Sequence, residues 1–176
     1  MAQVSGYTLR GAIKRWELRR DTAAKQFTST LFAFEGEEKA TPDEVAKQFG
    51  DCEAAIAALQ AAQARYNLAV VVVVKTPDVS TSMTLCEAVK RLGGAGRIEK
   101  MWRVATNGVK DRYGRGDDVE MERDPDRVRA HRTLPVKDTL IRATKAAAFA
   151  NALRAAISEA NANKVEIDLD AGLLFE

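Results

Sequence analysis

The sequence predicts a mainly α protein: an antiparallel bundle of about four helices with a small two-stranded β element, folded as a single domain over residues 1–176. Four long segments repeat apolar residues at the period of an amphipathic helix. Two short segments are instead rich in β-branched residues or alternate between apolar and polar positions, which is typical of strands. A length of 176 residues with 46% hydrophobic residues suits one globular domain.

The first helix is predicted from Thr8 to about Leu31. Its apolar residues follow a spacing close to 3.6, with the members Leu9, Ile13, Trp16, Ala23, Phe27 and Leu31. Arg20 interrupts this stripe, and we expect its aliphatic stem to cover the stripe while its head group reaches water. The helix is followed by the charged turn Glu35-Gly36-Glu37-Glu38.

The second helix carries the strongest pattern. Thr41 is expected to cap it, Pro42 suits its first turn, and the acids Asp43 and Glu44 complement the helix dipole. A heptad seam then extends over three heptads through Val45, Phe49, Cys52, Ile56, Leu59, Gln63 and Tyr66. This seam predicts coiled-coil packing, either against the first helix or against another chain.

Two strands are expected. The run Leu68–Val74 has no alternating polar residue, so both of its faces should be covered, and Pro77-Asp78 closes it. Val165–Leu169 alternates cleanly, which predicts a half-buried strand. We expect Val70–Val74 to pair with Val165–Leu169 and the pair to cap one end of the bundle.

The third helix is predicted to begin near Thr84, where Thr84-Leu85-Cys86-Glu87 has the spacing of a capping box. Glycines at 93, 94 and 96 predict a break or kink, because each costs about 1 kcal/mol inside a helix. The final helix is predicted from about Val136 to Asn163, with one face formed by Leu140, Ala143, Ala146, Ala150, Leu153, Ile157 and Ala160.

Residues 107–133 are expected to form a long charged loop, with seven basic and seven acidic residues. Connections this long tend to be functional. Guanidinium groups suit phosphates and Tyr113 suits base stacking, so a candidate ligand site combines this loop with the basic first helix. Its members are Arg15, Arg19, Arg112, Tyr113, Arg127, Arg129 and Arg132. The alternative is a solvated surface whose basic groups pair with the neighbouring acids.

A slender, alanine-rich bundle buries little apolar area by itself, so we expect homo-oligomerisation through the heptad seam and the valine strand. The predicted interface residues are Phe49, Ile56, Leu59, Tyr66 and Val72. No metal site is predicted: His131 is the single histidine, and Glu166, Asp168 and Asp170 fit the outward face of a strand as well as they fit a cation site.

Four local motifs resemble a family of small uncharacterised bacterial helical proteins often labelled septicolysin. They are the basic opening helix, the Glu35–Glu38 turn before a helix that ends in Ala64-Arg65-Tyr66-Asn67, the segment Thr84-Leu85-Cys86-Glu87-Ala88, and Ile157-Ser158-Glu159-Ala160-Asn161. The resemblance implies long antiparallel helices and supplies no catalytic residue. The valine run and the segment Lys164–Glu176 depart from the family pattern.

The sequence therefore predicts a non-enzymatic, self-associating structural or interaction protein. The alternative function is an oligomeric binder of a phosphorylated or nucleotide-like ligand. The expected partners are a second copy, and an anionic small molecule or an acidic protein. Neither a membrane nor nucleic acid is expected as a partner, because the formal net charge is only +2 and no apolar run could span a bilayer. No cofactor is predicted, and two reduced, buried cysteines without an export signal predict a cytoplasmic location.

Overall fold

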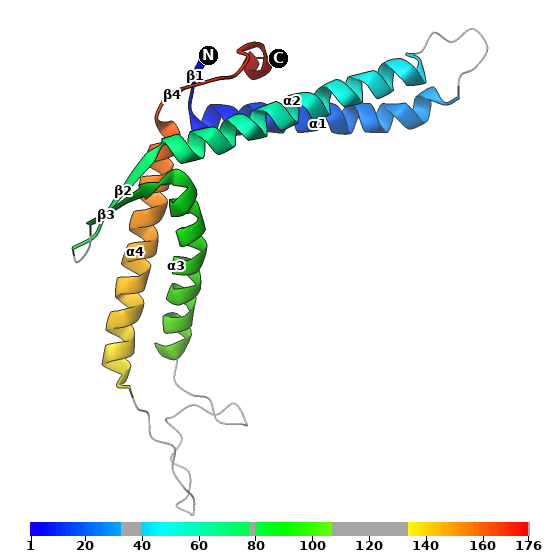
Figure 1. The fold of residues 1–176 in the computed structure, drawn as a ribbon. Coiled ribbons are helices and arrows are strands. Elements are labelled where there is room, and N and C mark those ends of the chain that lie inside the picture. The colour runs from blue at the N-terminus through cyan, green and yellow to red at the C-terminus, as the bar shows by residue number, and fades with distance from the viewer. Residues whose placement is uncertain (33–39, 78–79, 107–133, 176) are drawn as a thin grey trace, which may run out of the picture. The chain divides into compact units, whose positions relative to one another are not determined.

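The computed structural model describes residues 1–32, 40–77, 80–106 and 134–175. Their secondary structure is mainly α, with two small two-stranded sheets, which confirms the predicted fold class (Figure 1). The chain divides into two compact units, one made of Met1–Val72, Met83–Cys86 and Ile157–Glu176, the other of Val73–Ser82 and Glu87–Ala156. The loop predicted at 107–133 lies outside the described residues, and the single domain stays a prediction.

The first unit is built on a hairpin of two long helices, α1 (Gly6–Thr30) and α2 (Pro42–Ala69), which pack along each other (Figure 1). The Ser5 hydroxyl caps α1 by accepting a hydrogen bond from the Thr8 backbone N–H. Thr41 caps α2 in the predicted way and completes a capping box with Glu44, whose carboxylate accepts from the Thr41 N–H at 2.9 Å. This hydrogen bond lowers the pKa of Glu44.

The heptad seam of α2 is filled by α1 of the same chain. Buried residues on α1 are Leu9, Ala12, Ile13, Trp16 and Ala23, and those on α2 are Val45, Cys52, Ala55, Ile56, Leu59, Ala62 and Tyr66. The sequence left two possible partners for this seam, the first helix or another chain. In the structure the partner is the first helix. Burial raises the pKa of the Cys52 thiol, whereas Cys86 is only half-buried.

Both ends of the described chain belong to this unit. Strand β1 (Ala2–Val4) pairs antiparallel with β4 (Val165–Ile167), with Ala2 opposite Ile167 and Val4 opposite Val165. The short helix α5 (Gly172–Phe175) packs on α1, and Trp16 Nε1 donates a 3.0 Å hydrogen bond to the Leu173 carbonyl.

The predicted pairing of Val70–Val74 with Val165–Leu169 is wrong. Strand β2 (Val71–Lys75) pairs with β3 (Ser80–Thr84), the next strand along the chain, and Pro77 lies between two paired strands instead of after an isolated one. The prediction that both faces of β2 are covered is also wrong. Val72 and Val74 are buried, whereas Val71 and Val73 are about half exposed.

The second unit contains α3 (Leu85–Thr106) and most of α4 (Val136–Ala162). The predicted break at the glycines is not observed, since α3 is continuous through residues 93–96. Ala95 is buried there. Packing of this kind outweighs the intrinsic cost of glycine in a helix.

Glycine substitutions should separate the helix-weakening glycines from the one that packing requires. A Cβ at Gly50 or Gly96 would meet no atom within 4 Å, whereas at Gly6 it would collide with the Asn161 amide and lie 3.0 Å from the Tyr66 ring. Gly50→Ala and Gly96→Ala should each raise the free energy of unfolding by about 0.5–1 kcal/mol. Gly6→Ala should lower it by about 1 kcal/mol or more. Urea unfolding monitored by circular dichroism measures all three; equal effects of the three substitutions would contradict this account.

Candidate interaction surfaces

Tyr66, a predicted interface residue, instead joins three helices of the first unit. Its side chain is fully buried, and its hydroxyl lies 2.8 Å from the Ala160 carbonyl and 2.7 Å from the Asn163 carbonyl. The Ala160 carbonyl lies in the last turn of α4 and also accepts from the Asn163 N–H, and the Asn163 carbonyl lies just beyond the helix. Burial raises the pKa of the Tyr66 hydroxyl, and a backbone hydrogen bond from Gly6 opposes this shift.

The other predicted interface residues fall into two groups. Ile56, Leu59 and Val72 are buried within this chain, as Tyr66 is, so these four residues offer no surface to a second copy. This corrects the predicted interface, and the reason is that α1 fills the seam of α2. Phe49 differs, with 37% of its surface exposed.

The two described members of the predicted arginine site are engaged inside the chain. The Arg15 guanidinium donates a hydrogen bond to the Leu174 carbonyl, and that of Arg19 lies over the Trp16 ring, 5.0 Å from its centroid. Both contacts lie beside the packing of α5 on α1, and both side chains remain exposed at the surface. The other members, Arg112, Tyr113, Arg127, Arg129 and Arg132, lie outside the described residues.

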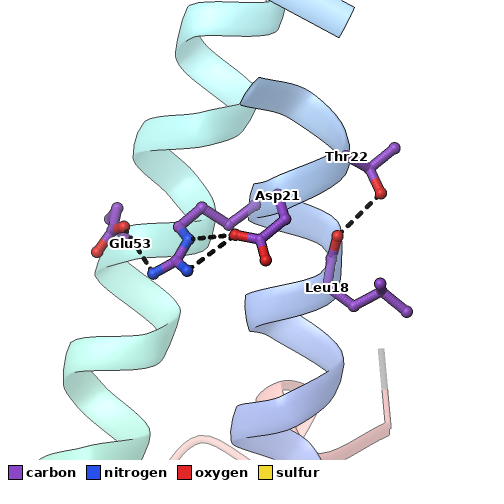
Figure 2. Close-up of polar contacts among 5 residues, drawn as sticks. Leu18, Asp21, Thr22 and Glu53 are labelled. Atoms are coloured by element: carbon purple, nitrogen blue, oxygen red, sulfur yellow. Dashed lines mark hydrogen bonds and ion pairs between the residues drawn. The ribbon is translucent and has the colours of Figure 1, made fainter. Parts of the chain in front are cut away.

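Arg20, which interrupts the apolar stripe of α1, links the two helices of the hairpin through ion pairs with Asp21 of α1 and Glu53 of α2, both labelled in Figure 2. Its guanidinium lies 2.8 Å from the Asp21 carboxylate and 3.3 Å from that of Glu53 on α2. The hydrogen bond to Asp21, with a smaller contribution from Glu53, raises the pKa of Arg20. The Arg20 side chain is 31% exposed at the edge of the seam, consistent with the expectation that its head group reaches water.

Beyond Arg20, toward the connected ends of α1 and α2, the hairpin is hollowed. The α1–α2 hollow has a volume of about 330 Å³ and is lined by Ala23, Ala24, Phe27, Val45, Ala46 and Phe49. Its alanines are too small to fill the space between the helices, and the rings of Phe27 and Phe49 remain 38% and 37% exposed. The apolar spacing indicated both phenylalanines, but the hollow depends on alanines from two helices and could not be predicted from either one.

A second depression lies between the helices of the other unit. The α3–α4 groove has a volume of about 340 Å³ and is lined by Arg91, Gly94, Ala95, Ile98, Ala146 and Phe149. Arg142 of α4 lies over the Trp102 ring of α3 at 5.1 Å, and Arg154 lies 3.6 Å from the Glu99 carboxylate. Apart from its glycines, which predict a helix break, the sequence carries no signal for this groove.

Within the described ranges, no group of three or more His, Cys, Asp or Glu residues could hold a metal ion. Asp170 instead accepts a 2.9 Å hydrogen bond from the Gly172 N–H at the start of α5, and the Asp168 carbonyl accepts from Arg65. No helix in this part of the chain has the length and hydropathy to cross a membrane.

Comparison with known proteins identifies a fold but no family. No protein-family model and no curated protein matches the chain. A solved structure, described as a functionally unknown conserved protein from Corynebacterium diphtheriae, is similar with a TM-score of 0.58 and 15% sequence identity. The likeness covers 94% of this chain and 100% of the other. At this identity it shows a shared fold alone, and the resemblance to septicolysin-labelled proteins stays a prediction.

Removing the Tyr66 hydroxyl should destabilise the first unit. Tyr66→Phe keeps the ring in place but leaves the Ala160 and Asn163 carbonyls without this donor, at an expected cost of about 1–3 kcal/mol in the free energy of unfolding. Tyr7→Phe is the matched control, because the Tyr7 hydroxyl bonds Ser158 at an exposed position and should contribute less. Chemical unfolding of the two variants measures the difference. An equal loss in the free energy of unfolding would show that the buried hydrogen bond of Tyr66 contributes no more than the exposed one of Tyr7.

The raised pKa of Tyr66 also predicts a dependence on pH. The unfolded chain loses this proton near the ordinary value of 10.0, below the pKa in the folded protein. The stabilisation is therefore complete below about pH 10 and is lost as the pH rises through the folded pKa. The wild type should lose stability above pH 10 more steeply than Tyr66→Phe, as measured by urea unfolding at a series of pH values. Parallel profiles would contradict this assignment.

Proposed function

We propose that the chain is a non-enzymatic interaction protein that acts through association with a second copy of itself, and that the α1–α2 hollow is the contact surface. The single observation that carries the proposal is the hollow with its two exposed phenylalanine rings. In a contact between identical copies, one surface patch must complement itself. The hollow has both halves of such a self-complementary patch. Its recess with an alanine floor can receive a ring, and the two aromatic rings at its edge can fill the recess of a second copy.

Packing provides the physical reason for association. Protein interiors are packed closely, and a space lined on both sides by apolar atoms forfeits dispersion contacts. A ring of Phe27 or Phe49 from a second copy could enter the recess, and its own exposed surface would leave water in the same step. Both effects favour the pair over two separate chains.

Charge supports a particular arrangement of the two copies. Helix α1 carries six basic and two acidic residues, whereas α2 carries four acidic and two basic residues. A two-fold axis parallel to the hairpin places α1 of one copy over α2 of the other, so that basic and acidic helices face each other and the same hollow meets itself. The outcome is a four-helix bundle assembled from two hairpins.

The alternative function, binding of a phosphorylated or nucleotide-like ligand, has less support than self-association. Its described arginines, Arg15 and Arg19, already contact the Leu174 carbonyl and the Trp16 ring. The contacts seen in the described residues therefore favour association over anion capture.

Light scattering coupled to size-exclusion chromatography tests the proposal. The wild type at micromolar concentration should have about twice the 19.2 kDa mass of the chain. Phe49→Glu should weaken association by about tenfold or more and shift the mass toward one chain, because it places an unpaired charge in the contact.

Leu18→Glu is the matched control. Leu18 lies on α1, is 69% exposed and points away from α2 (Figure 2), so the same charge introduced there should leave the mass unchanged. A wild type with the mass of a single chain throughout the micromolar range would refute self-association. An equal effect of both variants would refute the assignment to the hollow.

A further inference from the structure

The helix pair α3–α4 presents a long apolar surface around its groove. Ile98, which lines the groove, is 51% exposed, and Met101, one turn further along α3, is 56% exposed. The bottom of the groove is lined by the small residues Gly94, Ala95 and Ala146, so another helix can approach closely. The spacing of Arg91, Gly94, Ile98 and Met101 follows one face of α3, so the surface has the direction and period that an added helix needs.

The charge of this helix pair selects the kind of occupant. Helix α3 has five basic and two acidic residues, and α4 has four basic and two acidic residues. One of these acids, Glu99, is engaged by Arg103 and Arg154 inside the pair. Arg91 is exposed and lines the groove, and the exposed Arg142 of α4 lies one helical turn before Ala146, so positive charge borders the groove on both helices.

From this combination we infer that the α3–α4 groove binds an acidic amphipathic helix of a partner protein. Apolar side chains at positions i, i+3, i+4 and i+7 of that helix contact Ile98 and Phe149, and its flanking carboxylates meet Arg91 and Arg142. A second copy of the same surface fits poorly, because it would bring two basic helix pairs together. This surface is separate from the α1–α2 hollow, so the inference does not depend on self-association.

A labelled peptide provides the probe. The peptide has about 18 residues, with leucine at i, i+3, i+4 and i+7 and glutamate at the remaining positions, so that it extends about 27 Å as a helix. A matched peptide carries lysine in place of every glutamate. Fluorescence anisotropy with the full chain should show saturable binding of the glutamate peptide only, and the affinity should fall as salt is added.

Variants locate the site. Ile98→Glu and Arg91→Glu should each weaken binding of the glutamate peptide by about tenfold. Lys100→Glu is the matched control, since nine residues of helix place Lys100 on the opposite side of α3 from Arg91, and its effect should stay within about twofold. Circular dichroism checks that each variant is folded. Phe49→Glu should bind the peptide as the wild type does, which distinguishes a failure at this groove from a failure at the hollow.

Several outcomes would overturn the inference. Equal binding of the lysine peptide would show that the groove does not distinguish acidic from basic peptides. An equal loss of peptide affinity in Lys100→Glu would show that the peptide binds elsewhere. Displacement of the peptide by vesicles of phosphatidylglycerol, but not of phosphatidylcholine, would assign the surface to an anionic membrane. A fall in the mass of the unliganded protein on Ile98→Glu would assign it to a second copy.

Discussion

The buried hydroxyl of Tyr66 is the contact on which the first unit depends. It brings the end of α4 and the beginning of α1 to the side of α2, through the Ala160 and Asn163 carbonyls and the Gly6 backbone. The approach is close enough that residue 6 has no room for a Cβ beside Asn161. The buried hydroxyl of one seam residue thus fixes where three helices meet, since the paired arrangement is far more favourable than leaving these polar groups buried without partners.

Much of the helical architecture could be predicted from local patterns. The start of α2 followed from Thr41 and Glu44, and the extents of α1 and α4 followed from apolar spacing, because caps and periodicity are encoded within a few residues. Strand pairing could not be predicted in the same way. Strand β4 pairs with β1, a three-residue strand that carries almost no pattern of its own, and β2 pairs with its neighbour β3. The glycines of α3 do not break the helix, because intrinsic propensity does not include the packing around it.

The candidate surfaces were predicted only in part. A heptad seam has the same sequence signature whether its partner is another helix of the chain or another chain, and here α1 occupies most of it. Phe49 stays exposed because the nearby positions on both helices are alanines, a property of the pair and not of one helix. The α3–α4 groove arises in the same way, from small residues of α3 lying opposite Ala146 and Phe149. Such features depend on residues far apart in sequence, where local patterns carry no information.

The pairing of β1 with β4 and the packing of α5 on α1 also affect the order in which the protein folds during translation. Residues 2–16 emerge from the ribosome first, yet their partners at 165–174 emerge only after more than a hundred further residues have been made. Until then Trp16 and the first strand lack their native cover, which exposes an apolar surface to other nascent chains. Contacts of such large sequence separation also slow folding, because a long loop must close before they form. A chain interrupted before residue 165 would therefore carry a complete α1–α2 hairpin with an unfinished edge.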